Sequence, residues 1–448
     1  ASHYTCLPYP LSHPTPNTHE ETVIYISLIH HTNNTNPQPM SVRAAAAAAT
    51  ADVRVITYNL LSPELSEPST FPENTPEECD GKNRLPRILI QLEEEILNHS
   101  IIALQEVSIT WLGPLHELFD RHNYHYTHTL YGGWYSGYMG VGLAFPRELY
   151  SLSTLEIKRI AETKNWPKLT PKTRSNDKGS KDSVVVASPG IVSRSWNYST
   201  GYLRNVLDPL FVLGGYAFGG NSEDGEEETK SKSSSKYVKK EDPPDIATFY
   251  RAKKRSNQAI FERLCRRSDG RMFCVANYHN PCEISMRPII TLHAVLYVEK
   301  AQQFASGNPL IVCGDFNMQP DSGGYELVTT GQLDRFHPEY PLLPSEDPWR
   351  PTLLKMESAY HVANGVEPVM TNKAVRLIGK WGAEPNAFAG TLDYIFISKG
   401  MNVKDTVPLP SDDDMKPVSW PTAVIPSDHL MLGATLQLPE LCEEESKL

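Results

Sequence analysis

The chain has 448 residues, 40% of them hydrophobic, which is enough for one large folded core or for two or three average domains. Its 42 basic and 53 acidic residues give a formal charge of −11, and this balance argues against a protein that coats nucleic acid through a basic excess. It does not exclude an enzyme that handles one nucleotide end through a metal ion. No run of 18 or more apolar residues occurs, so we expect no membrane segment.

The seven cysteines are widely spaced, and none forms a Cys-x-x-Cys pair. Their odd number and spacing disfavour a zinc site and indicate reduced thiols. Residues 1–50 lack the basic flank and apolar core of a secretory signal, and the stretch 1–39 is rich in His, Thr, Asn and Pro. We expect the segment to be disordered, with Met40 as the natural start. We also expect an intracellular protein, cytoplasmic or nuclear.

The first periodic stretch, 53–60, alternates as a strand does and carries Asn59 near its end. Apolar residues at three- and four-residue spacings predict a helix over 84–99, and 111–121 predicts a second, shorter one. Between them, 101–107 is a buried strand in which Glu106 follows five mainly apolar residues. An acid there is costly to bury unless it is paired or bound to a cation. Asn59 is equally compatible with a simple turn.

Two further strands, 124–130 and 140–146, surround the sequence Tyr-Gly-Gly-Trp-Tyr-Ser-Gly-Tyr. These aromatic residues either line a substrate mouth or pack within their own loop. A strand follows at 152–160. The cationic stretch 164–182 is either a basic rim for a polyanion or a solvated loop, and the second is favoured.

Residues 219–244 are acidic, then rich in Ser and Lys, and end in two prolines. Such a composition buries too little apolar surface to fold, which predicts a disordered insertion within one domain. A linker between two domains is the alternative. The acidic tail 439–448 ends the chain.

A hairpin is predicted from 258–264 and 271–277, joined by an Asp-Gly turn, with His279 just beyond it. A helix over 289–303 leads into the apolar strand 310–313, whose tip carries Asp315 and Asn317. In an extended segment these two side chains would point into the same cleft. Asp and Asn also end strands for purely structural reasons.

The last third of the chain is rich in loops over 334–370 and then has two strand signals. The first, 391–397, places Asp393 among apolar neighbours. The second follows the tripeptide Ser427-Asp428-His429 and runs to about residue 436. A Ser-Asp-His sequence directly before a buried strand is unusual for a simple turn.

Six short motifs follow one another along the chain: Tyr-Asn-Leu at Asn59, Gln-Glu-Val at Glu106, His279, Gly-Asp-Phe-Asn at 314–317, Leu-Asp-Tyr at 392–394 and Ser-Asp-His at 427–429. In this order they resemble the motifs of the endonuclease/exonuclease/phosphatase (DNase I-like) superfamily. The sequences at 390–395, 407–410 and 426–429 are similar to its deadenylase-type subgroup, which includes nocturnin, the Angel proteins and the carbon-catabolite-repression deadenylase.

The resemblance implies an α+β fold, a four-layer αββα sandwich in which two mixed sheets pack face to face between helices. The domain would span 51–438. The resemblance also implies a magnesium-dependent phosphoester hydrolase, with one or two Mg²⁺ ions for which Mn²⁺ can substitute. Glu106 would bind Mg²⁺, and Asn59 would assist directly or through water. A second ion would lie near Asp315 and His429.

By the same resemblance, Asp315 would orient and deprotonate the attacking water, and Asn317 and His279 would hold the phosphoryl oxygens. His429 would stabilise the transition state, while Asp428 and Asp393 fix histidine orientation.

Phe388 matches an aromatic residue that stacks on adenine in the deadenylases. The chain departs from that subgroup at Ile284, where a proline is usual, and at Tyr278 and Asn280 on either side of His279. Leucine-rich repeats that dock one member of the subgroup to its scaffold are absent from the sequence, which does not identify protein partners.

Three functions follow from these observations. The first is a 3′–5′ exoribonuclease that acts on poly(A) or related RNA and releases nucleoside 5′-monophosphates. The second is a phosphatase that acts on a small nucleotide or dinucleotide cofactor. The third is a non-catalytic nucleic-acid-binding module, which the intact Glu106, Asp315 and His429 disfavour.

Overall fold

The computed structural model describes residues 52–169, 244–347, 349–377 and 385–440. The expected disordered start, nearly all of the low-complexity insertion and most of the acidic tail lie outside the described residues, as does most of the cationic stretch. The expected limits of the folded domain therefore stay a prediction.

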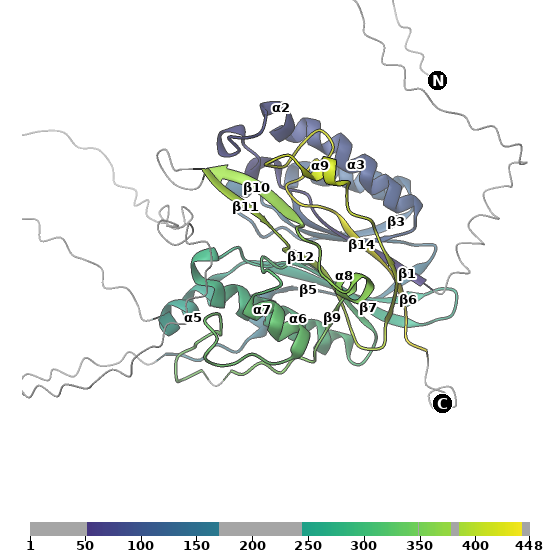
Figure 1. The fold of residues 1–448 in the computed structure, drawn as a ribbon. Helices are drawn as coiled ribbons and strands as arrows, with labels where there is room; N and C mark the ends of the chain where they lie inside the picture. Colours follow the sequence, from purple (N-terminus) through teal and green to yellow (C-terminus); the bar gives the residue numbers. More distant parts are fainter. Residues whose placement is uncertain (1–51, 170–243, 348, 378–384, 441–448) are drawn as a thin grey trace, which may run out of the picture. The chain divides into compact units, whose positions relative to one another are not determined.

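The described residues form two six-stranded mixed sheets (Figure 1). The first has the order β13-β14-β1-β2-β4-β3, and its central strands β1 and β2 run parallel. Its strands are β1 (Asp52–Asn59), β2 (Ile101–Val107), β3 (Tyr124–His128), β4 (Gly140–Pro146), β13 (Asn402–Thr406) and β14 (Leu432–Gln437).

The second sheet has the order β5-β6-β7-β8-β12-β9, and its parallel pair is β7 and β8. Its strands are β5 (Tyr150–Arg159), β6 (Gln258–Arg266), β7 (Met272–His279), β8 (Leu310–Asp315), β9 (Glu357–Ser358) and β12 (Asp393–Ile397). A separate antiparallel hairpin, β10 (Asn372–Leu377) and β11 (Pro385–Gly390), was not predicted from the sequence, and neither was β13.

Helices cover the outer face of each sheet. Figure 1 shows α3 (Gly81–Leu97) on one side of the two sheets and α6 (Arg287–Ala305) on the other. The helices predicted at 84–99, 111–121 and 289–303 are confirmed as α3, α4 and α6. Of these, α4 spans Leu112–Arg121, and the other helices are α2 (Pro76–Cys79), α5 (Pro244–Lys254), α7 (Gly323–Thr330), α8 (Ala359–Asn364) and α9 (Asp412–Met415). None of the described helices combines the length and apolar character needed to cross a bilayer.

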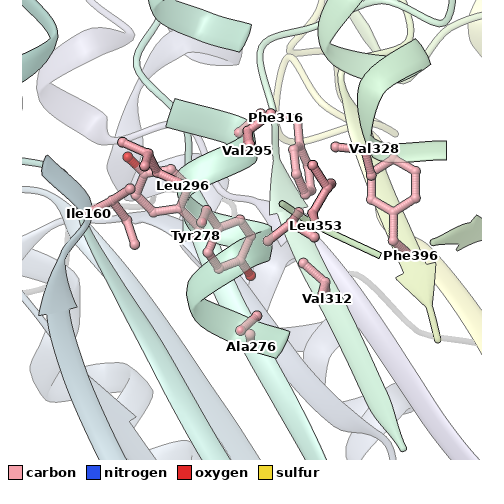
Figure 2. Packing of buried hydrophobic residues seen from close by; sticks show 14 of the residues in the cluster. Ile160, Ala276, Tyr278, Val295, Leu296, Val312, Phe316, Val328, Leu353 and Phe396 are labelled. Atoms are coloured by element: carbon pink, nitrogen blue, oxygen red, sulfur yellow. The ribbon is translucent and has the colours of Figure 1, made fainter. Parts of the chain in front are cut away.

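Three buried apolar clusters separate the four layers. The first lies between the first sheet and α3 and α4, and the second fills the space between the sheets. The third lies between the second sheet and α6 and α7, where Val295 and Leu296 of α6 pack against Tyr278 and Val312 of the strands (Figure 2). The expected four-layer sandwich is confirmed, because each sheet has an apolar side chain layer on both faces.

The central strands also show how the apolar core gives way to a polar site. Every second side chain along a strand lies on the same face of its sheet, and one of the two faces borders the space between the sheets. On β1, the buried Val53 and Val55 in this core are followed in the same phase by Asn59. On β8, Cys313 is followed in the same phase by Asp315. The carboxyl ends of the parallel pairs thus carry polar groups into one region.

Candidate active site

Four of the expected site residues follow directly from the strand register. Asn59, His279 and Asp315 are the last residues of β1, β7 and β8. Asp393 is the first residue of the antiparallel strand β12 and lies opposite Asp315 in the pairing register. Ligand sites of sheets with parallel strands are commonly found at such carboxyl ends.

A network of buried amides forms the floor beneath these groups. Gln105 Nε2 donates to Asn277 Oδ1 at 2.7 Å and to Thr57 Oγ1 at 2.9 Å. Asn277 Nδ2 in turn donates to the Leu104 and Gly142 carbonyls at 2.8 and 2.7 Å. Because these hydrogen bonds join both sheets, they fix the strands whose ends carry the site.

Glu106 reaches the site through a local break in the strand. Simple alternation on β2 would point its side chain at the helices, on the side of Ile102 and Leu104. The β2–β4 register shifts between Leu104 and Val107, and Glu106 has a φ of +54°, a conformation that non-glycine residues rarely adopt. Backbone strain of this kind persists where the surrounding structure enforces it, and it is common at functional sites.

Asp315 Oδ2 is the atom on which the site converges. It lies 3.0 Å from Asn59 Nδ2, 3.5 Å from His279 Nε2 and 3.7 Å from His429 Nε2. Gly314 allows this carboxylate to sit so close to β7, since a Cβ at Gly314 would lie 1.9 Å from the Tyr278 carbonyl oxygen.

Asn59 joins the two carboxylates that face each other across the site. Its Oδ1 accepts from the Leu61 amide at 3.0 Å, so its Nδ2 must face the site. The two hydrogens of Nδ2 serve Asp315 Oδ2 and Glu106 Oε1, at 3.0 and 3.3 Å. In this orientation the amide positions carboxylates and offers a metal ion no oxygen of its own.

His429 is held as a cation by its surroundings. Its Nδ1 donates to Asp393 Oδ2 at 2.8 Å, and Thr371 Oγ1 donates to the same oxygen at 2.6 Å. Burial alone would lower the pKa of His429, but the carboxylates of Asp393, Asp315 and Asp428 outweigh burial and raise it to about 10. Burial raises the pKa of Asp393 to about 6, with His429 opposing the rise. At neutral pH the pair is an imidazolium and a carboxylate.

The expectation that Asp428 orients a histidine is wrong. Asp428 Oδ2 accepts from Arg376 Nη2 at 2.5 Å, while its Oδ1 is 4.0 Å from His429 Nε2, beyond hydrogen-bonding distance. Burial would raise the pKa of Asp428, but the nearby Arg376 and His429 cations hold it below its usual range. Asp393 alone holds the His429 ring by its Nδ1.

The extended conformation expected for 315–317 is also wrong. β8 ends at Asp315, and Asn317 has a φ of +50°. Asp315 Oδ1 accepts from the Asn317 amide at 2.9 Å, so one carboxylate both closes the turn and serves the site. Asn317 Nδ2 donates to the Asn280 carbonyl at 2.9 Å. Asp315 therefore forms the expected turn through Oδ1, and its Oδ2 lies among the other expected site residues.

Phe388 lies on β11, where it is half-buried and paired with Ala374 of β10. A Cβ at Gly390, three residues before Asp393, would lie 2.9 Å from the Phe388 ring and 2.8 Å from Gln319 Nε2. Phe388 thus borders the segments that carry the site, without contacting the carboxylates. Ile284, at the other expected clamp position, is 40% exposed.

Several residues that support the site were missed by sequence reasoning. They are Ser62, whose amide donates to Glu106 Oε2 at 2.9 Å, Thr371, Arg376 and the buried Arg84. Thr371 and Arg376 belong to β10 or its approach, a stretch with no clear strand period. No local signal distinguishes such residues, because their partners are far away in the sequence.

The family comparison agrees with this geometry. A family model described as "Endonuclease/Exonuclease/phosphatase family" matches residues 56–429, a range that includes every expected site residue. The chain belongs to the endonuclease/exonuclease/phosphatase family. The expected superfamily is therefore confirmed.

Curated relatives of this family member match over shorter stretches. Human 2′,5′-phosphodiesterase 12 is 29% identical over 180 residues, which cover 38% of this chain and 27% of the relative. Human nocturnin is 28% identical over 193 residues, which cover 42% of this chain and 38% of the relative. The matches thus span well under half of each relative. Nocturnin belongs to the deadenylase-type subgroup that the motifs resemble, which supports the subgroup expectation.

A solved structure of ANGEL2, described as a 2′,3′-cyclic phosphatase in complex with adenosine-2′,3′-vanadate, superposes with a TM-score of 0.54. It is 17% identical and covers 86% of this chain and 96% of that chain. At this identity the likeness shows the fold alone, which agrees with the two packed sheets of this family member.

The donor set of this family member fits a hard divalent cation. Glu106 and Asp315 place carboxylate oxygens within 3.3 and 3.0 Å of the same amide nitrogen, and both side chains are buried. Such paired oxygen ligands suit Mg²⁺. Ligand atoms of Asp315, Asp393 and His429 also lie within 4.8 Å of one another. A protonated imidazole is a poor metal ligand, so the carboxylate oxygens are the donors in this cluster that suit a cation.

Proposed function

We propose that this chain is a magnesium-dependent phosphodiesterase that acts as a 3′–5′ exoribonuclease and releases nucleoside 5′-monophosphates. The convergence of Asn59, His279 and His429 on Asp315 Oδ2, beside the carboxylate of Glu106, carries this proposal. The names of two relatives, 2′,5′-phosphodiesterase 12 and carbon catabolite repressor protein 4 homolog 1, are consistent with a phosphodiester of a nucleic acid as substrate.

Asp315 is the general base in this proposal. Its Oδ2 is buried and lies 3.5 and 3.7 Å from the Nε2 atoms of His279 and His429, so a water molecule or phosphoryl oxygen bound against it would be within reach of both imidazoles. Asn59 holds the carboxylate in place through its Nδ2. Asp315 therefore orients the attacking water and accepts its proton.

His429 stabilises the negative charge that develops on the phosphoryl group. Because Nδ1 is bound to Asp393, the Nε2–H of the imidazolium faces the site. Asn59 Nδ2 donates to the Glu106 and Asp315 carboxylates, so its hydrogens do not compete with His429 Nε2–H for a phosphoryl oxygen. His279 Nε2 lies on the other side of Asp315 Oδ2 and supplies a second imidazole contact, while Asn317 acts through the turn that holds Asp315.

Glu106 is the metal-binding residue in this proposal. When bound there, Mg²⁺ would polarise the phosphate and neutralise its charge. Asn59 and the Ser62 amide hold the two Glu106 oxygens, at 3.3 and 2.9 Å, so the carboxylate is oriented by the protein itself.

A labelled oligo(A) with a free 3′-hydroxyl, incubated with the full chain and Mg²⁺, tests the reaction. We expect a ladder of products shortened from the 3′ end, and its loss when EDTA is added. The isosteric change Asp315→Asn should lower kcat by about 10²- to 10⁴-fold, the range expected for loss of a general base. The matched control Asp120→Asn, on the exposed face of α4, should leave kcat unchanged.

Each other outcome rejects part of the proposal. Free phosphate without shortening would identify a phosphatase, and binding without any product would identify a non-catalytic module. Full activity of Asp315→Asn would reject the assignment of the general base.

A further inference from the structure

Three aromatic side chains of one loop are exposed beside the site. The loop between β3 and β4, residues 131–139, is here called the aromatic loop. In it, Trp134 is 72% exposed, Tyr135 46% and Tyr138 48%. The Trp134 and Tyr135 rings meet edge to face at 6.3 Å. Tyr135 packs against Trp134 and against Gly133 of its own loop, so the loop-packing interpretation holds in part, but all three rings keep a large exposed surface.

The aromatic loop is connected to Glu106 by two hydrogen bonds through one residue. The Ser62 amide donates to Glu106 Oε2 at 2.9 Å, and the Ser62 hydroxyl donates to the Ser136 carbonyl at 3.0 Å. Ser136 directly follows Trp134 and Tyr135 in the short 3-10 helix η4 (Trp134–Ser136). Ser62 therefore links the backbone of the aromatic loop to the carboxylate that we assign to metal binding.

The backbone of the aromatic loop is held in one conformation. Gly137 and Tyr138 both have positive φ angles, +62° and +52°, and a Cβ at Gly137 would lie 2.2 Å from Glu64 Oε2. The Tyr138 amide donates to the Gly133 carbonyl at 2.9 Å, and the Ile109 amide donates to the Gly137 carbonyl at 2.9 Å. An exposed tyrosine in a left-handed conformation is unusual and is maintained only when its surroundings enforce it.

The chemistry around the loop selects the kind of ligand. Residues 129–140 contain no charged side chain, and the nearest carboxylate contact beneath the loop is Glu64, whose Oε2 accepts from Ser62 and Ser108 hydroxyls at 2.9 Å each. The loop itself therefore offers no cation that would pair with a phosphate or an acidic peptide. Flat, uncharged nucleobases fit exposed aromatic rings, since base–aromatic stacking needs no cation.

We propose that the aromatic loop is a stacking platform for unpaired bases of a single-stranded nucleic acid whose terminal phosphodiester lies in the site. This inference rests on the proposed function and names the part of the substrate that lies outside the reacting bond. Stacking of one base on an aromatic side chain contributes about 1–3 kcal/mol, which corresponds to about a 5- to 150-fold effect on affinity.

Binding to the inactive Asp315→Asn chain separates this inference from catalysis. We expect Trp134→Ala to weaken the affinity for an eight-nucleotide oligo(A) by about 5- to 150-fold, and to change the affinity for a dinucleotide by less than about twofold. Trp134→Phe should retain most of the affinity, because it keeps an aromatic face, and Trp134→Leu should resemble Trp134→Ala. Leu97→Ala is the control for loss of apolar surface, because Leu97 is 68% exposed at the C-terminal end of α3.

The outcomes distinguish the two proposals. If the oligonucleotide binds in a Trp134-dependent manner but the parent chain cleaves no strand, the proposed exoribonuclease function fails and the stacking platform stands. Equal affinities of parent and Trp134→Ala for the long strand overturn the platform. Equal losses for the dinucleotide and the long strand also overturn it, because the loop would then act on the reacting end. Absence of any nucleic acid binding overturns both.

Discussion

Replacing Arg84 by Met tests how the two ends of the chain are held together at the site. Arg84 lies on α3 with a fully buried side chain. Its guanidinium donates to the carbonyls of Leu60 and Leu61, at 3.0 and 2.6 Å, and to the carbonyl of Pro426 at 3.0 Å. The first two residues follow Asn59, and Pro426 precedes the Ser-Asp-His motif. One side chain thus ties together segments more than 300 positions apart, since Arg84 and Pro426 are separated by 342 positions.

The magnitude follows from the hydrogen bonds that are lost. Two more bonds join Arg84 to the Cys79 carbonyl at 3.3 Å and the Ser66 hydroxyl at 3.0 Å. Each buried acceptor left without its donor costs about 1–3 kcal/mol, but Met also removes the cost of burying a cation. Burial lowers the pKa of Arg84 to about 10, so it remains charged at neutral pH. We expect Arg84→Met to lower the free energy of unfolding by about 3–5 kcal/mol.

Urea unfolding and turnover of oligo(A) are the two measurements. Under conditions where the variant stays folded, kcat should fall by about 10- to 100-fold, because Asn59 and His429 lose a shared anchor. Arg87→Met is the matched control one turn along α3. Arg87 donates to the Thr422 carbonyl at 2.6 Å from a partly exposed position, and its loss should cost about 1 kcal/mol or less. An unfolding free energy of Arg84→Met within about 1 kcal/mol of the parent would refute this reasoning.

Three further changes test the core and the site. Glu262 is fully buried, and burial raises its pKa from 4.5 to about 8, with a hydrogen bond from Thr127 opposing the rise. The protonated form of Glu262 therefore stabilises the fold fully below pH 4.5, and this stabilisation is lost as the pH rises toward 8. Between pH 4.5 and 7, the free energy of urea unfolding of Glu262→Gln should rise by about 3 kcal/mol relative to that of the parent. Gly314→Ala would place a Cβ 1.9 Å from the Tyr278 carbonyl, so we expect a loss of about 3 kcal/mol or more in thermal or urea unfolding. Asp393→Asn removes the largest carboxylate contribution to the raised pKa of His429, so the alkaline limb of the kcat–pH profile should move to lower pH. The value of kcat should also fall by about 10²- to 10⁴-fold.

Each of these changes has a result that would contradict it. Glu117→Gln, on the exposed face of α4, should show no pH-dependent gain, and a similar pH dependence for both glutamine variants would reject the role of Glu262. Parent-like stability of Gly314→Ala would show that β7 and β8 can separate without cost. An unchanged alkaline limb in Asp393→Asn would show that His429 does not act as a cation.

Much of this protein was determined by local sequence pattern. The strands at β1, β2, β7 and β8 were predicted because their apolar runs act over a few residues, where periodicity is set by backbone geometry. The same alternation places Asn59 and Asp315 in phase with the core between the sheets. The order of six motifs then indicated the family.

Other features depend on contacts that no local pattern encodes. Glu106 enters the site because a register shift and a positive φ override strand alternation, and Asp428 turns away because Arg376 lies within reach of its carboxylate. Both depend on neighbours supplied by distant strands.

Asn59 illustrates the difference between what local pattern predicts and what long-range contacts determine. The sequence by itself placed it at the end of a strand, where a turn and a site were equally consistent. The tertiary structure shows both, since Asn59 Oδ1 accepts from the Leu61 amide in a local turn, while its Nδ2 contacts Asp315 at a separation of 256 positions and comes within 3.4 Å of His429 at 370. Periodicity specifies which face of a strand a side chain occupies, but only the packing of the two sheets brings these faces together around one carboxylate.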